Sequence, residues 1–119
     1  MDNTLNQINW QLFRNGLLLN VGYKLFNNQL VLTIKLSKLR ISDLNNEMQC
    51  FGNIIFLDIR NVATDSQNFN YEIAEIVDIH YKNIENEFYC FTFYCFLIKS
   101  KTFFQISFES KTFEWKSLF

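Results

Sequence analysis

Short stretches of alternating apolar and polar residues dominate this chain, a pattern typical of strands with one buried face. The clearest pair runs from Leu17 to Leu25 and from Gln29 to Leu36, and Asn27 and Asn28 between them suit the left-handed backbone of a tight turn. The pattern therefore predicts a hairpin with one apolar face on each strand. The residues of these faces are Leu17, Leu19, Val21, Tyr23 and Leu25 on the first strand, and Leu30, Leu32, Ile34 and Leu36 on the second.

Further strand patterns follow along the chain. Residues 54–62 form an apolar run that predicts one strand covered on both faces at its start. Residues 71–81 fit a strand or a helix, and the strand is favoured because β-branched residues dominate and no convincing cap precedes them. Residues 88–98 are aromatic and branched, as in a well-covered strand. Residues 102–109 alternate strictly, and residues 112–116 suit a last short strand.

The connections between these strands are short, with turns predicted at residues 83–86, 100–101 and 110–111. Six or seven strands joined in this way predict a mainly β fold. We expect residues 1–119 to form a single-domain antiparallel β-sandwich or a partly open β-barrel with at most one or two short helices. The chain has no proline to protect edge strands, so an edge-to-edge dimer stays open beside a monomer.

The residue types needed for catalysis or metal binding are scarce. His80 is the single histidine, and the three cysteines show no C-x-x-C spacing, which argues against a metal site. Cys90 and Cys95 lie five residues apart in one strand pattern, so they point to opposite faces. The three glycines do not form a phosphate-binding loop. We therefore expect no catalytic residues, no cofactor and no enzymatic activity.

Length and hydropathy bear on location. With 119 residues, 49% of them hydrophobic, the chain can build a core without disulfide or metal support. Its N-terminal residues lack the basic and apolar regions of a secretory signal, and no apolar run is long enough to span a membrane. We therefore expect a cytoplasmic protein with reduced thiols and no membrane association.

Charge is the best indication of a partner. The net charge of −1 gives no basic footprint for nucleic acid, but residues 65–87 carry six acidic residues against one basic residue. This segment predicts a surface that binds a basic protein partner. The expected partner-binding residues are Asp65, Glu72, Asp78, Glu85 and Glu87 for the charge, with Tyr71 and Tyr81 as aromatic anchors.

The order of several features resembles one group of bacterial proteins. Trp10 precedes the turn at Phe13–Gly16, the hairpin of residues 17–36 follows, a strand ends in Ile59–Val62, and the pattern Phe-x-Ile-x-Phe closes the chain at Phe104–Phe108. This is similar to the β-rich immunity proteins of contact-dependent growth inhibition and other polymorphic-toxin systems. The resemblance implies a cytoplasmic, non-enzymatic protein that neutralises a cognate toxin C-terminal domain, often a nuclease. Many such proteins are strongly acidic, whereas this chain is acidic only locally.

Two alternatives stay open. A small β-barrel carrier of an apolar ligand would have an internal cavity lined by Phe91, Phe93, Phe104 and Phe108. A structural interaction module of a phage or bacterium would share the features of an immunity protein. Direct oligonucleotide stacking is disfavoured, because residues 88–97 contain no basic residue among their aromatics.

Overall fold

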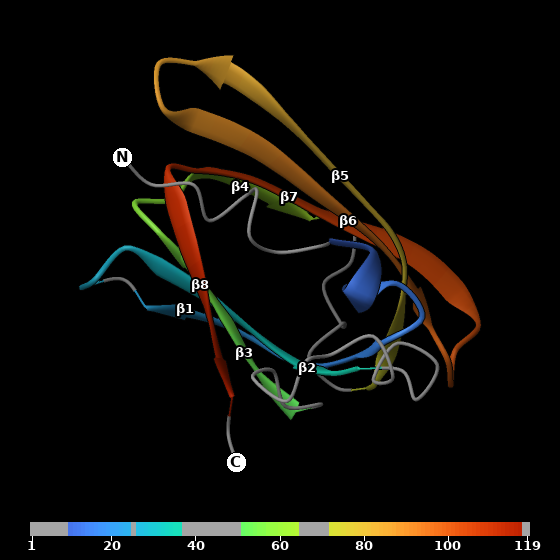
Figure 1. Cartoon of the computed structure of the whole chain (residues 1–119). Coiled ribbons are helices and arrows are strands. Elements are labelled where there is room, and N and C mark those ends of the chain that lie inside the picture. Colours follow the sequence, from blue (N-terminus) through green and yellow to red (C-terminus); the bar gives the residue numbers. More distant parts are fainter. Residues whose placement is uncertain (1–9, 25, 37–50, 65–71, 118–119) are drawn as a thin grey trace.

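The structure is a computed structural model that describes residues 10–24, 26–36, 51–64 and 72–117. Within these ranges it contains one short 3₁₀ helix and eight strands, shown in Figure 1. The elements are η1 (Trp10–Phe13), β1 (Leu17–Lys24), β2 (Gln29–Lys35), β3 (Phe51–Leu57), β4 (Arg60–Thr64), β5 (Ala74–Glu85), β6 (Phe88–Leu97), β7 (Thr102–Ser110) and β8 (Thr112–Ser117).

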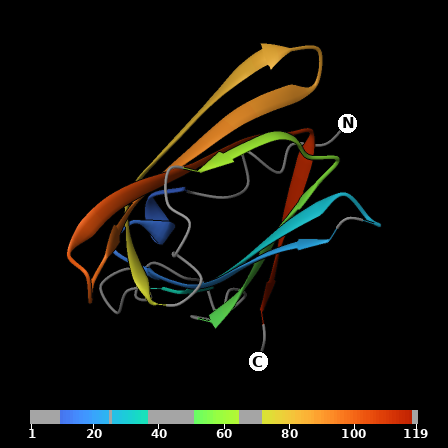
Figure 2. The same ribbon diagram turned by 180° about the vertical axis from the view of Figure 1, so that it is seen from behind.

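All eight strands belong to one antiparallel sheet with the order β4-β7-β6-β5-β1-β2-β3-β8. The sheet bends at the β5–β1 junction, where Leu17 pairs with Glu75 and Leu18 pairs with Ala74. The β4-β7-β6-β5 half therefore lies across from the β1-β2-β3-β8 half, and η1 sits between them (Figures 1 and 2). This confirms the predicted mainly β fold of the sandwich or partly open barrel type.

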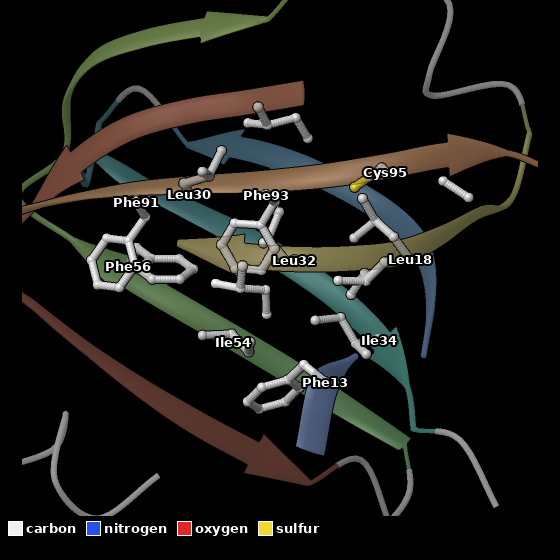
Figure 3. Packing of buried hydrophobic residues seen from close by; sticks show 14 of the residues in the cluster. Phe13, Leu18, Leu30, Leu32, Ile34, Ile54, Phe56, Phe91, Phe93 and Cys95 are labelled. Carbon is white, nitrogen blue, oxygen red and sulfur yellow. The ribbon is translucent and has the colours of Figure 1, made fainter. Parts of the chain in front are cut away.

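Aromatic rings fill the space between the two halves. The ring centroid of Phe56 on β3 lies 4.6 Å from that of Phe108 on β7 and 5.0 Å from that of Phe91 on β6. Trp10 of η1 contributes a further ring, 4.8 Å from that of Phe113 on β8. Figure 3 shows aliphatic side chains of β1, β2 and β3 near the rings of Phe56 and Phe91. The core therefore draws on both halves of the sheet and on the helix.

The predicted hairpin is present, although the buried face predicted for its first strand is wrong. On β2 the expected residues Leu30, Leu32 and Ile34 are buried. On β1 a bulge between Leu18 and Asn20 interrupts the alternation. Leu18 is therefore the buried residue where Leu17 and Leu19 were expected, and the predicted face resumes only at Val21. A residue that opposes nothing on the partner strand shifts every later side chain to the other face.

The strand predicted over residues 54–62 is in fact two strands. Asp58 and Asn61 adopt left-handed backbone conformations with φ of 53° and 56°. The chain leaves β3 after Leu57 and enters β4 at Arg60, and β3 and β4 lie in opposite halves of the sheet. Short polar side chains tolerate this conformation, and it breaks an extended run without glycine or proline.

Cover on both faces was also predicted incorrectly. On β3, Ile54 and Phe56 are buried, whereas Ile55 between them is only half-buried. On β6 the same alternation sets buried Phe93 against half-buried Tyr94. Each strand therefore has one core face and one partly solvated face, even where its sequence is apolar throughout.

Residues 71–81 were predicted as a strand, and residues 74–81 of this range lie in β5, whereas Glu72 and Ile73 precede the strand. A bulge at Val77 places Ile76 and Ile79 both in the core, so the simple alternation predicted there is wrong. The strand also continues to Glu85, into the turn expected at residues 83–86, and the chain reverses at residues 86–87, where Asn86 has φ of 50°. The turn at residues 100–101 is confirmed, and a single residue at 111 separates β7 from β8.

Candidate binding face

Strands β5, β6 and β7 have two unlike faces. Their inner face carries buried residues such as Ile79, Phe93 and Ile106, which belong to the core. Residues opposite one another in the register share a face, so the intervening positions form an outer face. Its rows across β5, β6 and β7 are Glu75–Phe96–Phe103, Asp78–Tyr94–Gln105, His80–Thr92–Ser107 and Lys82–Cys90–Glu109.

One end of the outer face is apolar and exposed. Phe103 keeps 74% of its surface exposed, and its ring centroid lies 4.8 Å from that of Phe96. Ile73 and Ile98 beside them are 47% and 46% exposed, and the Ile98 N–H donates to the Ile73 carbonyl at 3.3 Å. We call these four residues the apolar end. Contiguous apolar surface of this kind marks interaction sites more often than scattered exposed residues do.

A braced turn holds the apolar end in place. Glu72 accepts hydrogen bonds from the backbone N–H of Ser100 at 3.0 Å and from its hydroxyl at 2.7 Å. Lys101 takes a left-handed conformation with φ of 58°, and its N–H donates to the Leu97 carbonyl at 2.8 Å. The carboxylate of Glu72 thus fixes the β6–β7 turn against the start of β5.

The middle of the outer face is polar. Asp78 accepts the Ile79 N–H at 2.9 Å, lies 3.0 Å from Nε2 of His80, and lies 3.7 Å from Nε of Arg14. Partial desolvation opposes ionisation of Asp78, but the Ile79 N–H, His80 and Arg14 outweigh it and hold its pKa below the ordinary value. The imidazole of His80 also meets the ring of Tyr94 edge-on, with centroids 4.9 Å apart. This carboxylate is therefore already engaged within the chain.

The far end of the face is held by one guanidinium. Arg60 of β4 donates to Glu109 at 2.6 Å and to Glu85 at 2.5 Å, and its carbon Cζ lies 3.6 Å above the ring of Phe88. Hydrogen bonds from Arg60, and secondarily from Asn61, lower the pKa of Glu109, and the same carboxylates raise that of Arg60. Arg60 thereby ties the tip of the β5–β6 hairpin to β4 and β7.

Tyr81, the predicted aromatic anchor that the structure describes, is not on this face. Tyr81 is 43% exposed, but it lies on the inner side of β5, where its ring contacts those of Trp10 and Phe91. Tyr71 and Asp65, the most N-terminal of the predicted partner-binding residues, lie outside the described residues. The bulge at Val77 decides the position of Tyr81, because it breaks the alternation predicted for residues 71–81.

The remaining predicted carboxylates lie along β5 and its hairpin, but most of them have internal partners. Glu72 binds Ser100, Asp78 interacts with His80 and Arg14, and Glu85 pairs with Arg60. Glu87 at the exposed tip has no ion pair within the described parts of the chain. Among the described residues of the acidic stretch, Asp78 and Glu85 therefore form ion pairs and Glu72 is hydrogen-bonded to a neutral side chain, whereas Glu75 and Glu87 have no ion pair.

Sequence reasoning missed the aromatic residues of the outer face. Residues 88–98 were expected to be covered, which concealed Tyr94 and Phe96. Phe103 precedes the alternation of Phe104, Ile106 and Phe108, so it falls on the opposite side of β7 from that buried series. This phase difference is the sequence signal that identifies Phe103 as an exposed aromatic residue.

The thiols and the histidine do not form a catalytic arrangement in the described residues. Burial raises the pKa of Cys95 to about 12, which keeps this thiol protonated. Cys90 is half-buried on the outer face and lines a shallow depression with His80, but no hydrogen bond joins the two within the described ranges. The same ranges hold no cluster of three or more His, Cys, Asp or Glu side chains arranged for a metal ion.

Together these features define a bent antiparallel sheet with a filled aromatic interior and an exposed aromatic end on its outer face. No protein-family model, curated protein or solved structure matches the chain. Among the described residues, no helix is long and apolar enough to cross a membrane.

Proposed function

We propose that this chain is a non-enzymatic bacterial immunity protein that binds and neutralises a cognate toxin domain in the cytoplasm through its outer face. The observation that carries the proposal is the exposure of the apolar end, where Phe103 is 74% exposed while the core is filled. Exposed aromatic residues at the centre of an interface often supply most of its binding energy. The braced turn at Ser100 and Lys101 presents these residues on a preformed surface.

The charge contribution is smaller than the sequence indicated. Glu72, Asp78 and Glu85 have partners inside the chain, so their role toward a toxin is mainly to hold the outer face in shape. Exposed Glu87 and half-buried Glu75, which have no ion pair within the described residues, are the carboxylates left to attract a basic partner. We therefore assign specificity mainly to the apolar end and a modest increase in association rate to the charge.

The arrangement of the core supports this function over the carrier alternative. The ring of Phe108 lies 5.6 Å from that of Phe91 and 6.1 Å from that of Phe93, and Phe104 is only 4% exposed. Rings at these separations are in contact with one another. The residues that would line a ligand cavity instead fill the space between the two halves of the sheet.

Affinity capture from a lysate of the source bacterium tests the proposal. We expect the wild-type chain to retain a toxin C-terminal domain in stoichiometric amount, identified by mass spectrometry. The retained domain, expressed alone, should arrest growth, and co-expression of this chain should restore it. Capture of a non-toxic protein would instead favour the structural interaction module, and a bound lipid in the native mass spectrum would favour the carrier.

A matched pair of variants connects the function to the outer face. Phe103→Asp should abolish growth protection, because it introduces a charge at the apolar end. Phe26→Asp makes the same change at another exposed phenylalanine, in the β1–β2 turn, and should protect like the wild type. Equal protection by both variants would contradict a role for the apolar end.

A further inference from the structure

Among the described residues, the outer edge of β5 is unpaired along most of its length. At its start the edge is closed, since the Ile76 N–H donates to the Gly16 carbonyl at 2.9 Å and Arg14 donates to the Val77 carbonyl at 3.4 Å. From residue 79 to residue 85, no strand of the described chain pairs with this edge. Figures 1 and 2 show the β5–β6 hairpin projecting away from the rest of the sheet.

The backbone groups on this edge can be assigned from one hydrogen bond. The Ile79 N–H donates to the side chain of Asp78, so it points away from β6. Because hydrogen-bonding direction alternates along an antiparallel ladder, Tyr81 and Asn83 also direct their N–H and C=O groups outward. An edge of this kind is a template for another strand.

The side chains of residues 78–82 on β5 are complementary to those of the same segment in a second, antiparallel copy. Asp78 and Lys82 lie two residues on either side of His80, on the outer face. Ile79 and Tyr81 flank His80 on the inner face, and Tyr81 is 43% exposed. We propose that two copies of the chain associate by antiparallel pairing of their β5 edges, in the register that sets His80 opposite His80 of the second copy.

This register satisfies two conditions together. It sets Ile79 opposite Tyr81 of the other copy, and both carry outward backbone groups, so the pair is hydrogen-bonded. It sets Asp78 opposite Lys82 twice, through the two-fold axis, and opposite charges across strands are stabilising. Shifting the register by one residue would place backbone N–H and C=O groups that point outward on one strand opposite residues whose groups point toward β6 on the other. Shifting it by two residues would separate Asp78 from Lys82.

Pairing also rearranges the bonds now made by Asp78. The Ile79 N–H would exchange this carboxylate for the Tyr81 carbonyl of the second copy, and the released carboxylate would bind Lys82 of that copy. Bulges at Val77 and Ile84 border the segment and limit the paired length. The interface is therefore short, and its register depends on the two charge pairs.

Charge reversal tests the register directly, with sedimentation equilibrium of the full chain as the readout. We expect the wild type to have twice its chain mass of 14.3 kDa at high concentration. Lys82→Glu and Asp78→Lys each set like charges opposite one another, and each should weaken self-association at least about tenfold. An equimolar mixture of the two variants restores both opposite-charge pairs and should form a heterodimer.

Controls keep folding separate from association. Lys99→Glu makes the same charge change in the exposed β6–β7 turn and should leave dimerisation unchanged. Asp78→Lys also removes the contacts with Arg14 and His80, so circular dichroism must show native structure before its mass is interpreted. Lys82 has no ion pair within the described residues, so Lys82→Glu tests the register even if the other variant unfolds.

Three results would overturn the proposal. The first is a wild-type chain that remains monomeric at about 1 mM, above the dissociation constants of all but very weak complexes. The second is a Lys82→Glu variant that dimerises as well as Lys99→Glu. The third is the absence of a heterodimer between two folded variants that each fail to self-associate. In the wild type, amide exchange at Tyr81 should also slow as concentration rises.

Discussion

The hydroxyl of Ser110 donates a 2.6 Å hydrogen bond to the backbone carbonyl of Leu57 and so joins the end of β7 to the end of β3. These strands belong to opposite halves of the sheet. Ser110 is fully buried, and its oxygen also lies 2.9 Å from the carbonyl of Thr112. This contact holds the corner at which the chain crosses between the two halves, opposite the β1–β5 junction.

Replacing this hydroxyl should destabilise the fold. Ser110→Ala leaves the Leu57 carbonyl without its donor in a buried corner, and we expect a loss of about 1–3 kcal/mol in the free energy of unfolding. Ser107→Ala is the comparison, because Ser107 bonds Thr92 on the half-solvated outer face, where water can replace it. Urea unfolding measures both variants. Equal losses would contradict the corner role of Ser110.

The two faces of the sheet should respond differently to loss of a phenyl ring. Phe56→Ala removes a fully buried ring that contacts Phe91 and Phe108, and we expect a loss of about 3–5 kcal/mol in the free energy of unfolding. Phe103→Ala removes a ring that is 74% exposed, and it should cost less than about 1 kcal/mol. Chemical denaturation of both variants gives the comparison. Similar losses would mean that Phe103 is part of the structural core.

Acid should weaken the Arg60 network in a predictable direction. The pKa of Glu109 lies below its ordinary value of 4.5, first because of Arg60. The stabilisation that ionised Glu109 gains from Arg60 is therefore complete when the pH is above the ordinary pKa. It is lost as the pH falls through the lowered pKa. Arg60→Gln should be less stable near neutral pH and should lose less stability on acidification. Lys99→Gln serves as the charge-matched control, and parallel stability curves for both variants would refute the assignment.

The two described cysteines should differ in reactivity. Burial raises the pKa of Cys95 to about 12, whereas Cys90 is half-buried on the outer face. A thiol reagent near neutral pH should modify Cys90 at least about 100-fold faster than Cys95 in the native state. Peptide mass spectrometry separates the two sites. The difference should vanish in denaturant, and equal native rates would contradict the burial of Cys95.

The alternation of apolar and polar residues was sufficient to predict the buried face of strands that pair without a bulge. Leu30, Leu32 and Ile34 are buried as expected, and so are Ile106 and Phe108. It failed at the bulges near Leu19 and Val77, because a bulge depends on pairing with a distant strand.

The break between β3 and β4 was missed for a related reason. Asp58, which lies between the two strands, can be extended or left-handed, and tertiary pairing selects the left-handed form.

The candidate site was only partly predictable. The sequence indicates an acidic segment, but the cation that neutralises Glu85 is Arg60, a neighbour in space that is 25 residues away in the chain. Such long-range partners decide whether a carboxylate is available to a toxin, and composition alone does not report them. The exposure of Phe103 could have been predicted from the alternation, because Phe103 and buried Phe104 point to opposite faces of β7.

Calorimetric titration with the captured domain is the direct test of the proposed binding of a toxin domain to the apolar end. We predict that Phe103→Asp weakens binding at least about 30-fold, as expected for a central aromatic contact, while Phe26→Asp binds like the wild type. Wild-type affinity of a folded Phe103→Asp variant would contradict the account and move the binding site away from the outer face.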